Sequence, residues 1–132
     1  GHFYIDRQGR IEQWVPLERV AHHVRGFNPK SIGIELVNTG RYPLWFHSDH
    51  QAMTETYPDI QIQALIQLLR HLENELPGLD NIAGHEDLDV EMLPAEDRPD
   101  IEIQRKVDPG PLFPWSDVMN KITLKRVTVK DL

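Results

Sequence analysis

Two short segments carry residue types that could bind a metal ion and hydrolyse a substrate. Residues 84–87 contain His85, and residues 106–108 contain Lys106 and Asp108. A neutral imidazole and a carboxylate are ordinary zinc ligands, and an ammonium group beside them can hold the negative charge that develops during hydrolysis. The two segments together suggest a zinc hydrolase.

Each of these residues also has an ordinary structural explanation. A single histidine can equally be a satisfied core or surface residue, an aspartate before Pro-Gly is a common turn residue, and a single lysine is usually solvated. The interpretation of His85 as a ligand is favoured by its position directly after a predicted strand over residues 79–83. Ligands of open α/β sheets bind beyond the carboxyl ends of the strands, so this position favours a site.

Glu35 is the only charged residue inside the apolar segment 31–37, which is the strongest predicted strand of the chain. The period of two places Ile32, Ile34 and Leu36 on one face and Glu35 on the other. Burial of an isolated carboxylate is costly unless the group is paired or its pKa is raised. Glu35 is therefore either a general base at a metal site or a residue of an edge strand that faces water.

Four further histidines have side chains of the right type for a metal or substrate site. They are His22, His23, His47 and His50. Adjacent residues of an extended chain point to opposite faces, so at most one of His22 and His23 is expected to face any given site.

The spacing of apolar residues predicts the elements that position these side chains. Strands over residues 2–5 and 11–15 form a hairpin with Gly9 in its turn. Apolar residues at helical spacing predict a helix that starts near Pro58 and is ended by Pro77-Gly78. The strand before this helix and the strand after it make a βαβ unit.

The remaining segments are two long loops and the C-terminal region. Residues 38–57 and 86–107 are loops of a length that is usually functional. The first is rich in aromatic residues, which could form a sugar- or peptide-binding wall or could pack the loop onto the sheet. A short helix is expected over residues 115–122, followed by a tail that alternates like a strand.

Composition narrows the class of protein. The chain has 132 residues, enough for one domain, and a formal net charge of -7 that argues against nucleic acid as the partner. There are no cysteines, so a metal site must use His, Asp or Glu. No apolar run is long enough to span a membrane. The chain opens with Gly rather than Met, so residues upstream are expected.

Taken together, these segments resemble the zinc-dependent N-acetylmuramoyl-L-alanine amidases of the amidase-2 family. That family includes bacterial muropeptide amidases, phage lysozyme-type amidases and animal peptidoglycan recognition proteins. The matching stretches are residues 2–9, 23–35, 84–87 and 106–115, which run in the family's order. The last stretch, with Lys-Val-Asp-Pro-Gly-Pro, is the most specific.

The resemblance implies an α/β fold, with a mixed β-sheet flanked by helices and one zinc ion in a groove. It implies hydrolysis of the amide between N-acetylmuramic acid and L-alanine of peptidoglycan or muropeptides. His85 and Asp108 would be zinc ligands, Glu35 would activate the attacking water, and Lys106 would stabilise the oxyanion. His23 would contact the substrate in the groove.

The sequence departs from the family's pattern at its beginning. The family's first zinc ligand is a histidine on an early strand, and that strand is not among these residues. The resemblance therefore predicts an N-terminally incomplete catalytic domain over residues 1–122, a C-terminal tail over residues 123–132, and a third zinc ligand upstream of Gly1.

The missing first zinc ligand leaves two alternatives to an active enzyme. Without that ligand the chain could be a non-catalytic peptidoglycan-binding domain or an inactive fragment.

The Leu-Phe-Pro-Trp ending of the last matching stretch favours the cell envelope or periplasm over the cytoplasm.

Overall fold

The structure is a computed structural model that describes residues 1–22 and 24–132. Its elements, in chain order, are β1 (Phe3–Ile5), β2 (Ile11–Gln13), the 3-10 helix η1 (Asn28–Lys30), β3 (Ile34–Leu36), α1 (Asp59–Glu75), β4 (Asn81–Ile82), α2 (His85–Leu88), β5 (Met92–Pro94), β6 (Glu102–Gln104), α3 (Trp115–Met119), β7 (Lys125–Arg126) and the 3-10 helix η2 (Val129–Asp131).

The first sheet has the order β2-β1-β3 and is mixed. The predicted hairpin is confirmed, because β1 pairs antiparallel with β2, and the turn residue Gly9 adopts a φ of 81°. The Asp6 carboxylate closes the same turn by accepting the backbone N–H groups of Gln8 and Arg10. On its other side β1 pairs in parallel with β3, which places Glu35 opposite Tyr4.

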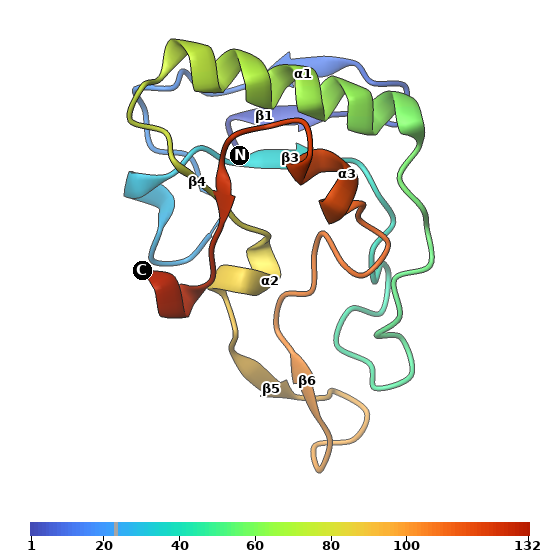
Figure 1. Ribbon diagram of the computed structural model, residues 1–132. Helices are drawn as coiled ribbons and strands as arrows, with labels where there is room; N and C mark the ends of the chain where they lie inside the picture. The colour runs from blue at the N-terminus through green and yellow to red at the C-terminus, as the bar shows by residue number, and fades with distance from the viewer. Residues whose placement is uncertain (23) are drawn as a thin grey trace.

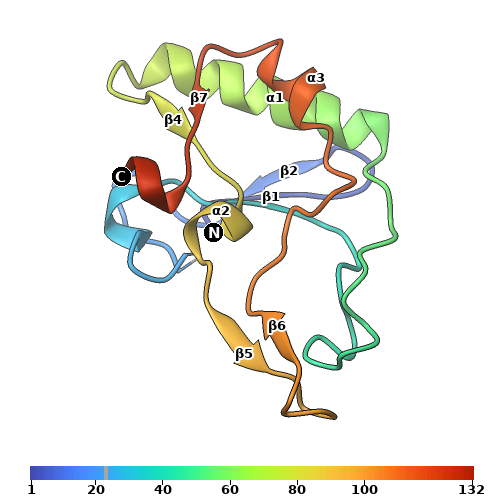
Figure 2. The ribbon, with the colours of Figure 1, turned by 60° about the horizontal axis from the view of Figure 1, so that its bottom comes forward.

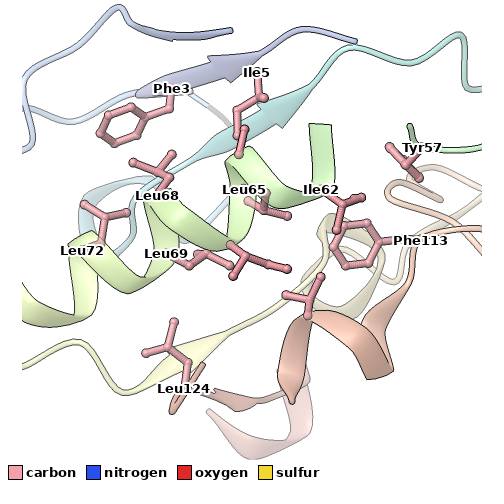
Figure 3. Packing of buried hydrophobic residues seen from close by; sticks show 13 residues of the cluster. Phe3, Ile5, Tyr57, Ile62, Leu65, Leu68, Leu69, Leu72, Phe113 and Leu124 are labelled. Atoms are coloured by element: carbon pink, nitrogen blue, oxygen red, sulfur yellow. The ribbon is translucent and has the colours of Figure 1, made fainter. Parts of the chain in front are cut away.

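Helix α1 supplies most of the core. Its buried apolar residues recur at helical spacing and pack against the inner face of β1 and against the C-terminal region (Figures 1 and 3). Each fully buried leucine or isoleucine contributes about 1.5–3 kcal/mol relative to an exposed one. The buried cluster consists of Phe3, Ile5, Tyr57, Ile62, Ala64, Leu65, Ile66, Leu68, Leu69, Leu72, Phe113, Val118 and Leu124.

Strand β4 pairs in parallel with β7, so residues of the expected tail take part in the fold. Leu124 and Val127, on either side of β7, are buried. The predicted β–α–β order is present as β3, α1 and β4. In the described part of the chain, however, β3 hydrogen-bonds to β1 alone and β4 to β7 alone. The facing edges of β3 and β4 therefore carry no strand.

The loop predicted over residues 86–107 contains α2 and an antiparallel hairpin of β5 and β6. The hairpin projects away from α1 in both views of the chain (Figures 1 and 2). It is tied to the 38–57 loop by the Glu96 N–H, which donates to the Phe46 carbonyl, and by Ser48, whose hydroxyl donates to Asp97.

Helix ends differ slightly from the predictions. Helix α1 ends at Glu75, just before Leu76, Pro77 and Gly78, and α3 ends at Met119 rather than near residue 122. Among the described residues, none of the helices has the length and apolar character needed to cross a lipid bilayer.

Candidate active site

The predicted site residues that the structure describes line one groove of about 1020 Å³. They are Glu35 on β3, His85 at the start of α2, and Lys106 and Asp108 in the segment that follows β6. The groove lies between the open edges of β3 and β4, and α1 contributes Leu65 and Leu69 to its floor. A groove of this size is at the upper end of the range of small-molecule binding sites.

His85 and Asp108 are brought into contact although they stand far apart in the sequence. The Nδ1 atom of His85 lies 3.3 Å from Oδ2 of Asp108, a distance slightly long for a hydrogen bond. Two ligand atoms that each lie about 2.0–2.1 Å from a tetrahedral zinc ion stand about 3.3 Å apart. The spacing and the chemistry of this pair therefore fit two ligands of one zinc ion.

The surroundings favour the ionised form of Asp108, which is the form that binds a cation. Burial against the groove walls raises the pKa of the Asp108 carboxyl, but contact with His85 and the positive charge of Lys106 lower this pKa by a larger amount. The net pKa of Asp108 is below its ordinary value. About half of its side chain stays exposed, so a ligand in the groove can reach it.

Short contacts fix α2 beside the Asp108 segment. The Glu86 N–H donates to the Asp108 carbonyl at 3.0 Å, and the Asp87 carboxylate accepts the Gly84 N–H at 2.8 Å. Gly84 is required for this approach, because a Cβ atom there would lie 2.7 Å from Cδ of Pro109. Glycine at position 84 therefore lets His85 come within reach of Asp108.

The other side of Asp108 is held by Tyr57 and by the turn at Gly110. The Tyr57 hydroxyl donates to the Pro109 carbonyl at 2.7 Å. Gly110 adopts a φ of 81° and packs against Met53, which leaves no space for a Cβ atom. Burial raises the pKa of Tyr57, and nearby carboxylates, with Asp108 the strongest of them, raise it further, so the phenol stays a hydrogen-bond donor.

The position of Glu35 agrees with features of both predictions from the sequence, an edge-strand residue that faces water and a general base beside a metal site. It lies on the open edge of β3 and is exposed, as expected of an edge strand that faces water. It also lines the groove that contains His85 and Asp108. Its charge contributes to the raised pKa of Tyr57, which places the carboxylate within electrostatic reach of the same site.

A third protein ligand for the His85–Asp108 pair is not found among residues 1–22 and 24–132. The predicted substrate contact, His23, lies outside the described residues. In the described ranges, the group of three that could hold a metal ion is His47, Asp49 and Asp97, in the loops beside the β5–β6 hairpin.

One hydrogen bond and one longer contact with a carboxylate account for the position of His47 in this group without a metal ion. Its Nδ1 accepts the backbone N–H of Asp49 at 3.1 Å, which places the proton of the neutral ring on Nε2. That Nε2 lies 3.6 Å from Oδ2 of Asp97. A metal on Nε2 would require a proton on Nδ1, where the Asp49 N–H already points.

The sequence matches one family model over most of its length. That model is described as N-acetylmuramoyl-L-alanine amidase, and it matches residues 1–111. The chain belongs to this amidase family. The match includes every predicted site residue, from His23 and Glu35 to Asp108.

Curated members of the amidase family are similar to this chain. It is 32% identical to the 1,6-anhydro-N-acetylmuramyl-L-alanine amidase AmpD of Enterobacter cloacae, over 85% of this chain and 51% of that protein. It is 36% identical to the N-acetylmuramoyl-L-alanine amidase AmiD of Escherichia coli, over 83% of this chain and 37% of that protein. The chain thus spans about half of the length of the first of these relatives and just over a third of the second.

Solved structures agree with the amidase family fold. A selenomethionine derivative of AmpD matches 92% of this chain and 59% of its own, with a TM-score of 0.65 and 30% identity. The amidase LysC from Clostridium intestinale matches 94% of this chain and 64% of its own, with a TM-score of 0.64 and 25% identity. These neighbours confirm the predicted mixed α/β fold.

Two supporting residues of this amidase-family site escaped the sequence analysis. Arg126 forms two hydrogen bonds with the Asp87 carboxylate and stacks on Trp115, with its Cζ atom 3.9 Å from the ring centre. Tyr57 holds Pro109. The hydrogen-bond partner of each lies more than thirty positions away in the sequence, and the local pattern around Arg126 or Tyr57 gives no sign of the contact.

Proposed function

We propose that this domain is the catalytic domain of a zinc-dependent amidase that hydrolyses the amide between N-acetylmuramic acid and L-alanine of peptidoglycan or muropeptides. The observation that carries the proposal is the 3.3 Å contact between His85 and Asp108 in a groove that also contains Glu35 and Lys106. Membership of the amidase family supports the choice of bond.

In this proposal His85 and Asp108 hold the zinc ion. A zinc ion held there would polarise the scissile carbonyl and lower the pKa of its bound water to about 7. The exposed Glu35 carboxylate accepts a proton from the attacking water and passes it to the leaving amine. The Lys106 ammonium holds the negative charge on the carbonyl oxygen of the tetrahedral intermediate.

A third zinc ligand, a histidine, is proposed to come from a strand outside these 132 residues. Catalytic zinc usually has three protein ligands and one open position. The open edges of β3 and β4 face each other across the groove, and apolar side chains of α1 line its floor. One added strand would pair with both edges and would carry its side chains directly over the site.

The test compares Glu35→Gln with Glu12→Gln in the full-length protein. Glu12 and Glu35 pair with Tyr4 from its two sides, so the two glutamates occupy matched positions on one face of the sheet. Cleavage of a muropeptide is followed by chromatography, with and without a chelator. We expect Glu35→Gln to lower kcat by a factor of about 10²–10⁴ and Glu12→Gln to leave it unchanged.

Cleavage that survives complete removal of zinc would reject the metal mechanism. Full activity of the Glu35→Gln protein would reject the general-base role while leaving the zinc site intact. In either variant, zinc stoichiometry measured on the folded protein separates loss of the metal from loss of the base.

The second candidate function is a non-catalytic peptidoglycan-binding domain. It is favoured because, in the described ranges of the chain, His85 and Asp108 have no third protein ligand beside them. A full-length protein that binds muropeptides but holds no stoichiometric zinc would establish binding and exclude catalysis. One zinc per chain, lost in Asp108→Asn, would exclude the binder.

The partner is proposed to be peptidoglycan or its fragments in the cell envelope. A net charge of -7 disfavours nucleic acid as a partner. The Leu-Phe-Pro-Trp sequence at residues 112–115 supports an envelope location. Fractionation of cells that produce the full-length protein tests this location directly.

A further inference from the structure

We infer that Arg41 is a positioning residue for the reaction, because its guanidinium fixes the backbone that leads into Lys106 and Asp108. This inference rests on the proposed function. Arg41 belongs to the 38–57 loop and lines the groove close to the site.

The guanidinium of Arg41 donates hydrogen bonds to three acceptors within the protein. Its Nη1 donates to the Gln104 carbonyl at 2.7 Å and to Oε1 of Gln51 at 2.7 Å, and its Nη2 donates to the Arg105 carbonyl at 2.6 Å. The two carbonyls are consecutive, so the planar guanidinium grips the last residue of β6 and the residue after it. The next residue is Lys106, and Asp108 follows two positions later.

Packing holds the guanidinium itself in place. Its Cζ atom lies 5.6 Å from the centre of the Phe46 ring, and Gln51 in turn donates to the Trp45 and His47 carbonyls of the same loop. A charge-assisted hydrogen bond from a preorganised guanidinium is stronger than a neutral one. Arg41 therefore holds the backbone before Lys106 in a fixed position relative to the 38–57 loop.

The two ends of the same loop hold the site segment from both directions. Arg41 binds the backbone on the upstream side, and Tyr57, at the far end of the loop, binds the Pro109 carbonyl on the downstream side. Between these anchors stand Lys106 and Asp108, the two residues whose placement the proposed reaction requires. Precise placement of a charged group and a metal ligand is worth a large factor in rate.

The experiment compares Arg41→Gln and Arg41→Lys with Arg7→Gln in the full-length protein. Arg7 is the matched control, because its guanidinium donates to the Glu55 carboxylate of the same loop through Nε and Nη2. Two measurements are made on each variant: muropeptide cleavage resolved into kcat and KM, and hydrogen exchange of a peptide that covers residues 104–108.

We expect Arg41→Gln to lower kcat by a factor of about 10–100, with KM changed by less than about threefold. Faster exchange over residues 104–108 should accompany the loss. Arg41→Lys should recover part of kcat, since one ammonium group cannot bind both carbonyls as the guanidinium does. Arg7→Gln should leave kcat and exchange in this segment unchanged.

A change in KM without a change in kcat would make Arg41 a substrate contact and overturn the inference. Unchanged exchange over residues 104–108 in Arg41→Gln would also overturn it, whatever the activity. Failure of the proposed function is a separate result: the unsubstituted protein would then lack zinc-dependent cleavage, while the exchange measurement would still report on the anchoring of the segment.

Discussion

Replacement of Gly84 by alanine tests whether the close approach of α2 to the Asp108 segment forms the site. Gly84 has an ordinary backbone conformation, with a φ of -78°, so alanine adds no backbone strain. Its Cβ atom would instead lie 2.7 Å from Cδ of Pro109 and 3.3 Å from Cζ2 of Trp115. Both neighbours are rigid rings, which cannot turn aside as a flexible side chain would.

The size of the effect follows from these distances. Ordinary van der Waals contact begins at 3.4 Å, so α2 and Pro109 must separate by about 0.7 Å. Overpacking of this kind costs about 1–3 kcal/mol in the free energy of unfolding. Because His85 directly follows Gly84, the same shift moves its imidazole away from Asp108. A displacement approaching 1 Å at a reacting group costs up to about 10²-fold in rate.

The assay combines three measurements on the full-length Gly84→Ala protein. Urea denaturation gives the free energy of unfolding, calorimetric titration gives the zinc affinity, and chromatography of muropeptide products gives kcat/KM. Gly78→Ala is the matched control, because a Cβ atom at Gly78 meets nothing within 4 Å. The control should stay within about 0.5 kcal/mol of the original stability and should keep its zinc affinity.

Equal behaviour of the two alanine variants would refute the reasoning. If Gly84→Ala unfolds at the same urea concentration as Gly78→Ala and binds zinc as tightly, the approach of α2 to Pro109 is not what places His85. A loss of stability with unchanged zinc affinity would assign Gly84 to packing alone.

Three further predictions concern the supports of the fold and the site. Leu69→Ala should lower the free energy of unfolding by about 2–5 kcal/mol in urea denaturation, because Leu69 is buried in the core; a loss below 1 kcal/mol would contradict this. Hydrogen bonding, chiefly to Arg7, lowers the pKa of Glu55 from 4.5 to about 2. The ionised Glu55 should therefore stabilise the fold fully above pH 4.5 and lose this effect as the pH falls toward 2. Thermal unfolding of the Glu55→Gln protein should lack the decrease in stability that the original protein shows over this pH range. Tyr57→Phe should cost about 0.5–1.5 kcal/mol in the same urea assay, because it removes only the hydroxyl that donates to Pro109; no loss would show that the bond is dispensable.

The sequence was sufficient to predict the contact between His85 and Asp108, but only through the order of the family's motifs. The local pattern at Asp108 does not distinguish a ligand from a turn residue, and the position of His85 after a predicted strand favours a site without naming its partner. Local pattern was enough for α1 and for the β1–β2 hairpin, because repeated apolar spacing and a turn glycine act within a few residues. The period-two pattern also placed Glu35 on the face opposite Ile34.

Strand pairing and long-range anchoring could not be predicted. Strand β4 has two residues, too few for a period to show which neighbour it pairs with. The β5–β6 hairpin lies in a segment that is predicted as a loop, and Pro94, which disfavours a strand, ends β5 in a two-stranded ladder where a missing N–H is tolerated. Arg41 was overlooked because its partners are backbone carbonyls 63 and 64 residues away, which no side-chain motif reports.

The open edges of β3 and β4 have a consequence for handling the polypeptide. Unsatisfied N–H and C=O groups along a strand are a template for another chain, and an apolar floor beside them adds to the attraction. Copies limited to these 132 residues would therefore tend to add strands to one another, with self-association that rises with concentration. Solubility would thus depend on what covers this furrow as much as on the surface charge.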